Sequence, residues 1–360
     1  MTTPYQPLSQ NRPWDSQSEL LECTMVLRDS HNVMTHCFRS ASGRWFDYLP
    51  GQFITLELPL GGQTVHRTYT LSSSPSRPLC LSITTKAGGE GSITRWLHRN
   101  LKVGDKIRAY GPAGLFSFVH NPADKYLFLA GGVGITPLMS MTRYLFDTGI
   151  HTDVTFVQCA QTPSDLLFRR ELEHIGARLP EFKVAYVCEK PDEYGVWTGY
   201  TGRISPLLLE VICPDYFQRE IFCCGPAPFM QAVRDILHAA GYDMAHYHEE
   251  PFDTPVREEA DRPAHHDVIP DASHGAVLHL ARRERRLECS EGDTLLTVAK
   301  RAGVHIPSAC QFGVCGTCKV KKLSGEVHMV HNGGITDEEL AAGYVLACCA
   351  HPLGEVVIDY

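Results

Sequence analysis

Hydrophobic residues change their spacing twice between the two ends of this chain. From residue 19 to 120, short stretches alternate hydrophobic and polar side chains, as in QFITLELPL (52–60) and LCLSITTK (79–86), with glycine and proline between them. Short strands at such close spacing predict a small antiparallel β-barrel. We therefore expect a polar tail over 1–18 and a barrel domain over 19–120.

The second spacing occupies residues 121–252. Continuous apolar runs predict buried strands over 125–131, 153–160, 182–190 and 220–226, and helical spacing follows them over 137–149, 168–179, 204–212 and 228–241. Strands that alternate with helices predict parallel βαβ units. The expected second domain is therefore an α/β domain with a doubly wound parallel sheet.

The third part of the chain begins with a stretch rich in proline and acidic residues. Residues 253–275 have no apolar periodicity, which is typical of an extended linker. Strand patterns over 276–282 and 285–290, a helix over 294–303 and a last strand over 355–360 follow. They predict a small α+β domain over 276–360.

Composition narrows the class of protein. The chain has 43% hydrophobic and 21% charged residues, and no apolar run approaches the roughly 18 residues that cross a bilayer. Its N-terminus lacks the basic start and apolar core of a secretion signal. A net charge of -8 disfavours nucleic acid as a partner. We expect a cytoplasmic protein with neither a membrane nor a nucleic-acid partner.

Three cysteines cluster in SACQFGVCGTCKV (308–320). Cys310, Cys315 and Cys318 have the spacing CxxxxCxxC, which is the plant-type pattern for a [2Fe-2S] cluster. Gly313 and Gly316 allow the sharp turns of a loop that points N–H groups at a cluster. Zinc is the rival metal, but the second ligand pair of a structural zinc site is missing. A disulfide is disfavoured in a reducing compartment.

The fourth cluster ligand has two candidates, which are the adjacent cysteines of YVLACCAHP. The segment resembles plant-type ferredoxins, whose last ligand ends a short apolar, small, Cys tripeptide. This resemblance implies a β-grasp fold, with Cys348 as the ligand and Cys349 as a packed neighbour. His331 and Cys289 are weaker candidates, since lone residues of these types usually belong to the core or the surface.

A second motif lies in the barrel, in HRTYTLSSS (66–74) and GSITRWL (91–97). Alternation places Arg67 and Tyr69 on one face of a strand, where they can address the pyrophosphate and ring of a flavin, and Thr70 adds a hydroxyl. Gly91 and Thr94 begin a predicted helix whose N–H groups can hold phosphate. Together with GPAGLF (111–116), these motifs resemble the flavin domain of the ferredoxin–NADP reductase superfamily, which implies FAD rather than FMN.

A strand, a glycine turn and a helix meet in LFLAGGVGITPLMSM (127–141). Gly131, Gly132 and Gly134 allow a diphosphate to approach the N-terminus of a helix, and Thr136 lies in its first turn. The GxGxxG fingerprint is absent, so a purely structural turn remains the alternative.

A second turn supports a nicotinamide site. FCCGPAPFM (222–230) again ends a strand before a helix, with Cys224, Gly225 and Pro226 at the turn. In the reductase superfamily that it resembles, this cysteine lies near the carbon that yields hydride, which implies catalytic roles for Cys224 and Thr70. Phe252 matches an aromatic residue near the flavin of those reductases, and packing on the barrel is its alternative role.

The choice between NADH and NADPH depends on the residues that follow the second parallel strand, where the ribose of the coenzyme is expected to lie. Gln161 stands where many relatives carry arginine, which favours NADH. Arg169 and Arg170 could instead contact the 2′-phosphate of NADPH, which is the alternative.

The order of the three domains implies electron flow from NAD(P)H through FAD to the cluster and then to a partner. REIFCCGP, YHEE and HNGGITDEELAAGYVLACC resemble reductase components of Rieske-type oxygenases that demethylate quaternary ammonium compounds such as glycine betaine. The resemblance implies a Rieske-type oxygenase as electron acceptor. The alternatives are an NADH reductase of hybrid cluster protein and a binding or sensing module that retains cofactors.

Overall fold

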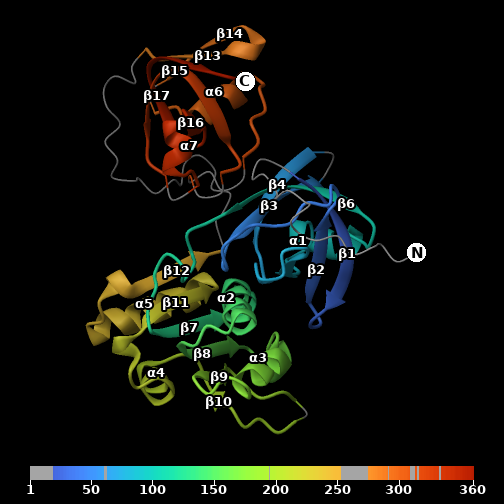
Figure 1. Ribbon diagram of the computed structural model, residues 1–360, viewed down its shortest axis with the longest axis vertical. Coiled ribbons are helices and arrows are strands. Elements are labelled where there is room, and N and C mark those ends of the chain that lie inside the picture. The colour runs from blue at the N-terminus through green and yellow to red at the C-terminus, as the bar shows by residue number, and fades with distance from the viewer. Residues whose placement is uncertain are drawn as a thin grey trace.

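The computed structural model describes residues 19–60, 63–193, 195–252, 275–290, 292–308, 313, 316–331 and 334–360. Three sheets follow one another along the chain, each in its own lobe in Figure 1. The predicted tail over 1–18 and the predicted linker over 253–275, except Gly275, lie outside the described residues. No helix among those described has the length and apolar character needed to span a bilayer.

The N-terminal sheet is antiparallel, with the strand order β4-β3-β6-β1-β2-β5. A bridge between Leu71, which follows β4, and Ile83 of β5 joins its two edges, so the sheet closes on itself. Alternation buries Ile54, Leu56 and Leu58 fully in the barrel core. The predicted antiparallel barrel is confirmed. Its elements are β1 (Glu19–Arg28), β2 (Val33–Ser40), β3 (Phe53–Leu60), β4 (Gln63–Thr70), β5 (Leu81–Lys86), α1 (Ile93–Asn100) and β6 (Lys106–Ala113).

The middle sheet is parallel, with the order β10-β9-β8-β7-β11-β12. The chain runs outward from β7 to β9 and later returns to place β11 on the other side of β7. This reversal creates a switch point at the carboxyl ends of β7 and β11. Its elements are β7 (Lys125–Gly131), α2 (Ile135–Thr148), β8 (Asp153–Ala160), α3 (Arg169–Gly176), β9 (Phe182–Cys188), β10 (Tyr200–Thr201), α4 (Pro206–Ile212), β11 (Glu220–Gly225), α5 (Ala227–Ala240) and β12 (Tyr247–Pro251).

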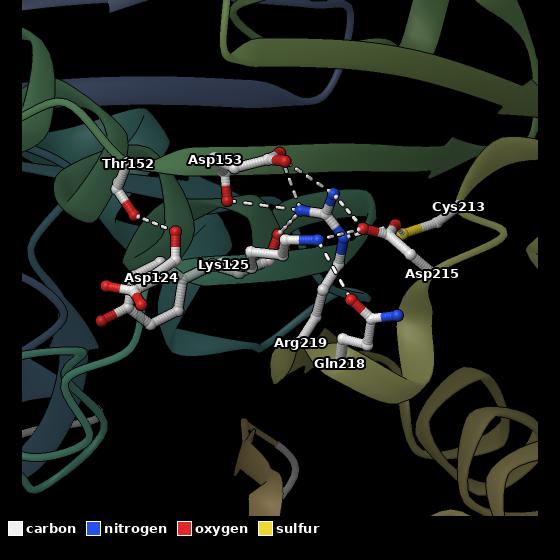
Figure 2. A network of polar contacts seen from close by, with 9 residues as sticks. Asp124, Lys125, Thr152, Asp153, Cys213, Asp215, Gln218 and Arg219 are labelled. Carbon is white, nitrogen blue, oxygen red and sulfur yellow. Dashed lines mark hydrogen bonds and ion pairs between the residues drawn. The ribbon is translucent and has the colours of Figure 1, made fainter.

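A network of polar contacts fixes the amino ends of the central parallel strands (Figure 2). The buried guanidinium of Arg219, just before β11, binds the carboxylates of Asp215 and Asp153 at 2.8–3.0 Å. It also donates to the Tyr126 carbonyl at 3.1 Å, and Lys125 Nζ lies 3.0 Å from Asp215 Oδ2. The network of Arg219 lies at the opposite end of these strands from the switch point. Its role is therefore to hold the strands of the sheet together.

Replacing Arg219 by alanine is expected to lower the free energy of unfolding by about 3–5 kcal/mol, because two carboxylates lose a buried charged partner. The hydrogen bonds from Arg219 hold the pKa of Asp215 well below its usual range. This stabilisation is therefore complete above about pH 5 and is lost as the pH falls below it. Urea unfolding of wild type and variant at several pH values measures both effects.

Arg203→Ala is the control for that experiment. Arg203 pairs with Glu189 at 3.1 Å, but its side chain is 79% exposed. Its loss is expected to cost less than about 1 kcal/mol. Equal losses for the two variants would contradict a structural role for the buried network.

The C-terminal sheet is mixed, with the order β14-β13-β17-β15-β16. The central strands β13 and β17 are parallel, and the remaining pairs are antiparallel. This agrees with the predicted α+β domain. Its elements are β13 (Val277–Leu280), β14 (Arg285–Glu288), α6 (Leu295–Arg301), β15 (Lys319–Met329), α7 (Asp337–Ala341), β16 (Tyr344–Leu346) and β17 (Ala350–Ile358). Short 3-10 helices lie at Gly132–Gly134, Pro163–Asp165, Tyr216–Gln218, Met244–His246 and Ala281–Arg283.

The C-terminal lobe, orange to red in Figure 1, contacts the barrel at β3 and β4. The buried Thr317 hydroxyl donates to the hydroxyl of Thr55 on β3 at 3.0 Å. The imidazole of His305 stacks on that of His66 on β4, with 6.0 Å between ring centroids. Thr317 precedes Cys318, so the described end of the cysteine segment lies against the barrel.

Candidate functional site

Two glycine turns meet at the switch point of the parallel sheet. One follows β7 and the other follows the adjacent β11. A methyl group on Gly134 would lie 2.3 Å from the carbonyl oxygen of Cys224, and one on Gly225 would lie 2.9 Å from the Gly131 Cα. Pro226 Cδ lies 3.1 Å from where a Gly131 Cβ would be. The two turns therefore pack backbone against backbone, at the sheet edge where α/β domains bind nucleotides.

The turn after β7 leads directly into α2. Gly132 has a φ of +53°, which favours glycine, and a 3-10 turn over Gly132–Gly134 follows. The buried Thr136 hydroxyl donates to the Val133 carbonyl at 3.2 Å, so it braces the turn from within. The N-terminus of α2 thereby lies at the switch point. The positive end of a helix dipole at that place favours the negative charge of a phosphate.

A hydrogen-bonded group links the barrel to these turns. Thr70, the last residue of β4, donates through Oγ1 to Glu250 Oε2 at 2.9 Å. Glu250 lies opposite Cys224 in the pairing of β11 with β12, and the Cys224 thiol donates to the Glu250 carbonyl at 3.1 Å. Burial raises the pKa of Glu250 to about 8, which the Thr70 hydrogen bond partly offsets. It also raises the pKa of Cys224 well above its usual value, so this thiol is not a thiolate nucleophile.

The predicted flavin residues line β4 and the start of α1. The Tyr69 hydroxyl is buried and has no hydrogen-bond partner among the described residues, which fits a group that is meant to meet a ligand. Arg67 is partly exposed on the same strand face. At α1, Gly91 has a φ of +78°, and the Thr94 hydroxyl accepts from the Gly88 amide at 2.9 Å. These residues fit a flavin with its pyrophosphate.

The cysteine segment is described in part, because Cys310 and Cys315 lie outside the described residues. The other two proposed ligands lie together, and the Cys348 amide donates to Cys318 Sγ at 3.4 Å. Gly316 has a φ of +68°, and a methyl group there would lie 2.8 Å from the Gly334 carbonyl oxygen. Two buried sulfurs, one of them receiving an amide hydrogen bond, fit the environment of an iron–sulfur cluster.

Comparison with protein families assigns all three domains. The oxidoreductase FAD-binding domain family matches residues 21–118, and the oxidoreductase NAD-binding domain family matches 128–235. The 2Fe-2S iron-sulfur cluster binding domain family matches residues 278–353. The FAD, NAD and [2Fe-2S] predictions are thereby confirmed at the level of domains.

Whole-chain relatives agree with this assignment. The chain is 49% identical to the stachydrine N-demethylase reductase subunit Stc4 of Rhizobium meliloti, over 96% of this chain and 97% of that protein. It is 47% identical to the glycine betaine monooxygenase reductase subunit of Pseudomonas aeruginosa, over 96% of each chain. This chain belongs to the family of monooxygenase reductase subunits. The reductase is also 32% identical to the NADH oxidoreductase HCR of Escherichia coli, over 87% of this chain and 89% of that protein.

Solved structures support the fold of the reductase. Phthalate dioxygenase reductase aligns with a TM-score of 0.57 at 22% identity and covers 95% of this chain and 98% of its own. The order of antiparallel barrel, parallel sheet and mixed sheet is therefore that of a known modular reductase.

The switch point brings together the two glycine turns, and Thr70 reaches from the barrel to Glu250 on the neighbouring strand β12. Arg67 and Tyr69 lie on β4, and Gly91 and Thr94 lie at the start of α1. Phe252, 36% exposed directly after β12, lies two residues beyond Glu250. Sequence reasoning did not single out Glu250, because its role depends on a contact between residues 180 positions apart. The sequence feature that could have indicated Glu250 is the pair of acidic residues in YHEEP, which follows the last helix of this domain.

Replacing Glu250 by glutamine is expected to flatten the pH profile of flavin reduction by NADH. In the wild type the carboxyl is neutral at pH 7 and becomes charged above about pH 8. Negative charge beside Thr70 opposes the arrival of hydride, so the rate constant should fall about tenfold at high pH. Stopped-flow bleaching of flavin absorbance measures it. Glu249→Gln, which removes a partner of Arg234, should keep the wild-type profile. An unchanged profile in the Glu250 variant would contradict this role.

Proposed function

We propose that this protein is the NADH-dependent reductase of a Rieske-type oxygenase that demethylates a quaternary ammonium compound. Glycine betaine and stachydrine are the candidate substrates, because the relatives that match nearly the whole chain serve oxygenases of those two compounds. The substrate binds to the oxygenase, and the reductase supplies electrons.

The main support for the proposal is that two adjacent strands of the barrel contact the two other domains. Thr70 on β4 contacts Glu250 of the nucleotide-binding domain, and Thr55 on β3 contacts Thr317 of the cluster domain. Phe53 of β3 pairs with Thr70, so the two contact points lie two residues apart along the pairing. Neighbouring strands are only about 5 Å apart, which supports a short path between the two junctions.

When bound, FAD turns the two electrons of a hydride into the single electrons that a [2Fe-2S] cluster carries. The chain's own residues set the geometry for this chemistry. The packed glycine turns would hold the nucleotide at the start of α2. Thr70 fixes the Glu250 carboxyl, and the Cys224 thiol donates to the main-chain carbonyl of Glu250. The Thr317 contact with Thr55 holds the residue that precedes Cys318 on the barrel.

Reconstitution tests the proposal. The reductase is mixed with purified Rieske-type oxygenases and NADH, and formaldehyde release from glycine betaine and from stachydrine is measured. Turnover of either compound supports the proposal. Rapid reduction of hybrid cluster protein, with no turnover by any of the oxygenases, would favour the alternative acceptor. That alternative is not favoured, since its relative shares 32% identity against 49% and 47%.

The surroundings of Arg169 support NADH as the coenzyme. Its guanidinium lies over the rings of Tyr186 and Trp197, at 5.4 and 5.7 Å from their centroids. Its Nε donates to Glu173 at 2.8 Å, so the charge is already paired. Arg169 must give up these contacts to bind a 2′-phosphate, which supports NADH.

We expect kcat/KM for NADH to exceed that for NADPH by at least about tenfold, which corresponds to about 1.4 kcal/mol. Glu173→Ala should raise the efficiency with NADPH by releasing Arg169. Arg170→Ala should leave the ratio unchanged. Equal efficiency with both coenzymes in the wild type would contradict the assignment.

A further inference from the structure

Two cysteines of the barrel lie in direct contact away from the cofactor sites. β2 pairs with β5 so that Cys37 stands opposite Ser82. Cys80 precedes Ser82 by two residues, in the loop that leads into β5, and so it lies near Cys37 at the end of this strand pair. The Cys37 thiol lies close enough to act as a hydrogen-bond donor to the Cys80 sulfur, as does the Phe38 amide. When it carries its proton, the Cys80 thiol donates to the Leu81 carbonyl at 3.7 Å. Cys80 is exposed and Cys37 is half-buried, so small molecules can reach the pair.

The pair lies beside the junction of the barrel with the nucleotide-binding domain. Val33 lies on the same face of β2 as Cys37 and packs into the core of that domain. Arg143 of α2 donates to the Ser72 carbonyl at 2.5 Å, and the Ser72 and Ser82 hydroxyls are 2.9 Å apart. A change at the two thiols could therefore alter the contact between the barrel and the nucleotide-binding domain.

The contact makes the two thiols chemically unequal. The hydrogen bond from Cys37 and a second from the Phe38 amide outweigh burial and lower the pKa of Cys80 to about 7. The same hydrogen bond, together with burial, raises the pKa of Cys37. By contrast, burial raises the pKa of Cys188 and of Cys213 to about 11. At neutral pH, Cys80 is therefore a substantial fraction thiolate beside a thiol that keeps its proton, as in an attacking and resolving pair.

We propose that Cys37 and Cys80 form a reversible dithiol–disulfide pair that hydrogen peroxide oxidises. The Cys80 sulfur attacks one peroxide oxygen, the O–O bond breaks, and the departing hydroxide takes a proton to become water. The Cys37 sulfur then attacks the resulting sulfenic sulfur, and water leaves with the Cys37 proton. In sum, two thiols and one peroxide give one disulfide and two waters.

The geometry allows the bond to close. A disulfide bond is about 2 Å long, so the two sulfurs must move toward each other to form it. Cys80 lies in the loop before β5, which begins at Leu81, so the approach does not require a break in the strand pairing. This inference goes beyond the proposed function and does not depend on which protein accepts the electrons.

Differential alkylation of the full-length holoprotein tests the pair. The protein is treated with a few equivalents of hydrogen peroxide, blocked with N-ethylmaleimide and digested with trypsin. We expect a cross-link between the peptides 29–39 and 68–86, lighter by two hydrogens and removed by dithiothreitol. Cys37→Ser should instead leave a sulfenic acid at Cys80 that dimedone traps. Cys213→Ser should behave as wild type, and the visible absorbance of the cluster reports its integrity.

Two outcomes would overturn the proposal. One is full maleimide labelling of both Cys37 and Cys80 after peroxide, with no dimedone adduct in Cys37→Ser. The other is a disulfide formed only between molecules, which a non-reducing gel reveals as a dimer that Cys80→Ser abolishes. Because Cys80 is exposed, Cys80→Ser is expected to fold and provides a second variant if Cys37→Ser does not.

Discussion

Replacing Cys348 by serine is expected to reduce NADH-dependent reduction of cytochrome c by about 100-fold or more, because a plant-type cluster requires four cysteine thiolates. NADH should still bleach the flavin, since the nucleotide turns and β4 lie in other domains. Iron content and visible absorbance of the purified variant measure loss of the cluster. Reduction of dichlorophenolindophenol, which accepts electrons from flavins directly, checks that the first half of the path is intact.

The adjacent cysteine is the matched control. The Cys349 thiol donates to the Leu346 carbonyl at 3.7 Å, whereas the Cys348 amide donates to the sulfur of Cys318. Cys349→Ser should therefore retain iron and reduce cytochrome c at close to the wild-type rate. If Cys349→Ser loses the cluster and Cys348→Ser keeps it, the proposed ligand assignment is wrong.

The continuously apolar strands could be predicted from the sequence, whereas two polar strands could not be predicted. The runs over 125–131 and 153–160 became β7 and β8 with the same bounds, because strands buried on both faces must be continuously apolar. β12 has the sequence YHEEP and is partly exposed along its length. β15 contains three lysines and was likewise not predicted. These strands are held by pairing with neighbours, which leaves no periodic signal in the sequence.

The same distinction applies to the functional residues. Glycine turns and cysteine spacings are local, so short motifs are enough to single them out. The structure packs the turns at Gly134 and Gly225 together and places Cys318 beside Cys348, and their roles in cofactor binding stay predictions. Contacts between domains are not local. Burial raises the pKa of the Glu250 carboxyl, and its hydrogen-bond partner Thr70 lies 180 residues away in the chain. No local motif in the sequence indicates either feature.

Replacing Gly134 by alanine is expected to slow flavin reduction by NADH about 100-fold. The new methyl group would lie 2.3 Å from the carbonyl oxygen of Cys224 and 2.5 Å from the amide nitrogen of Gly225. Both are backbone atoms, so the two turns must separate, and a misplacement near 1 Å costs about 100-fold in a positioned reaction. The φ of Gly134 is -63°, so alanine adds no backbone strain and the effect isolates the contact between the turns. Stopped-flow flavin absorbance gives the rate constant.

Gly149→Ala controls for the general cost of a methyl group on the same helix. Gly149 ends α2 with a φ of +67°, and nothing lies within 4 Å of an added Cβ. It should cost about 1–2 kcal/mol of stability and leave the hydride rate unchanged. Retained FAD and a native unfolding midpoint in Gly134→Ala would show that the slow rate arises in a folded protein. Flavin reduction at the wild-type rate in that variant would mean that the close packing of the two turns does not position the nucleotide.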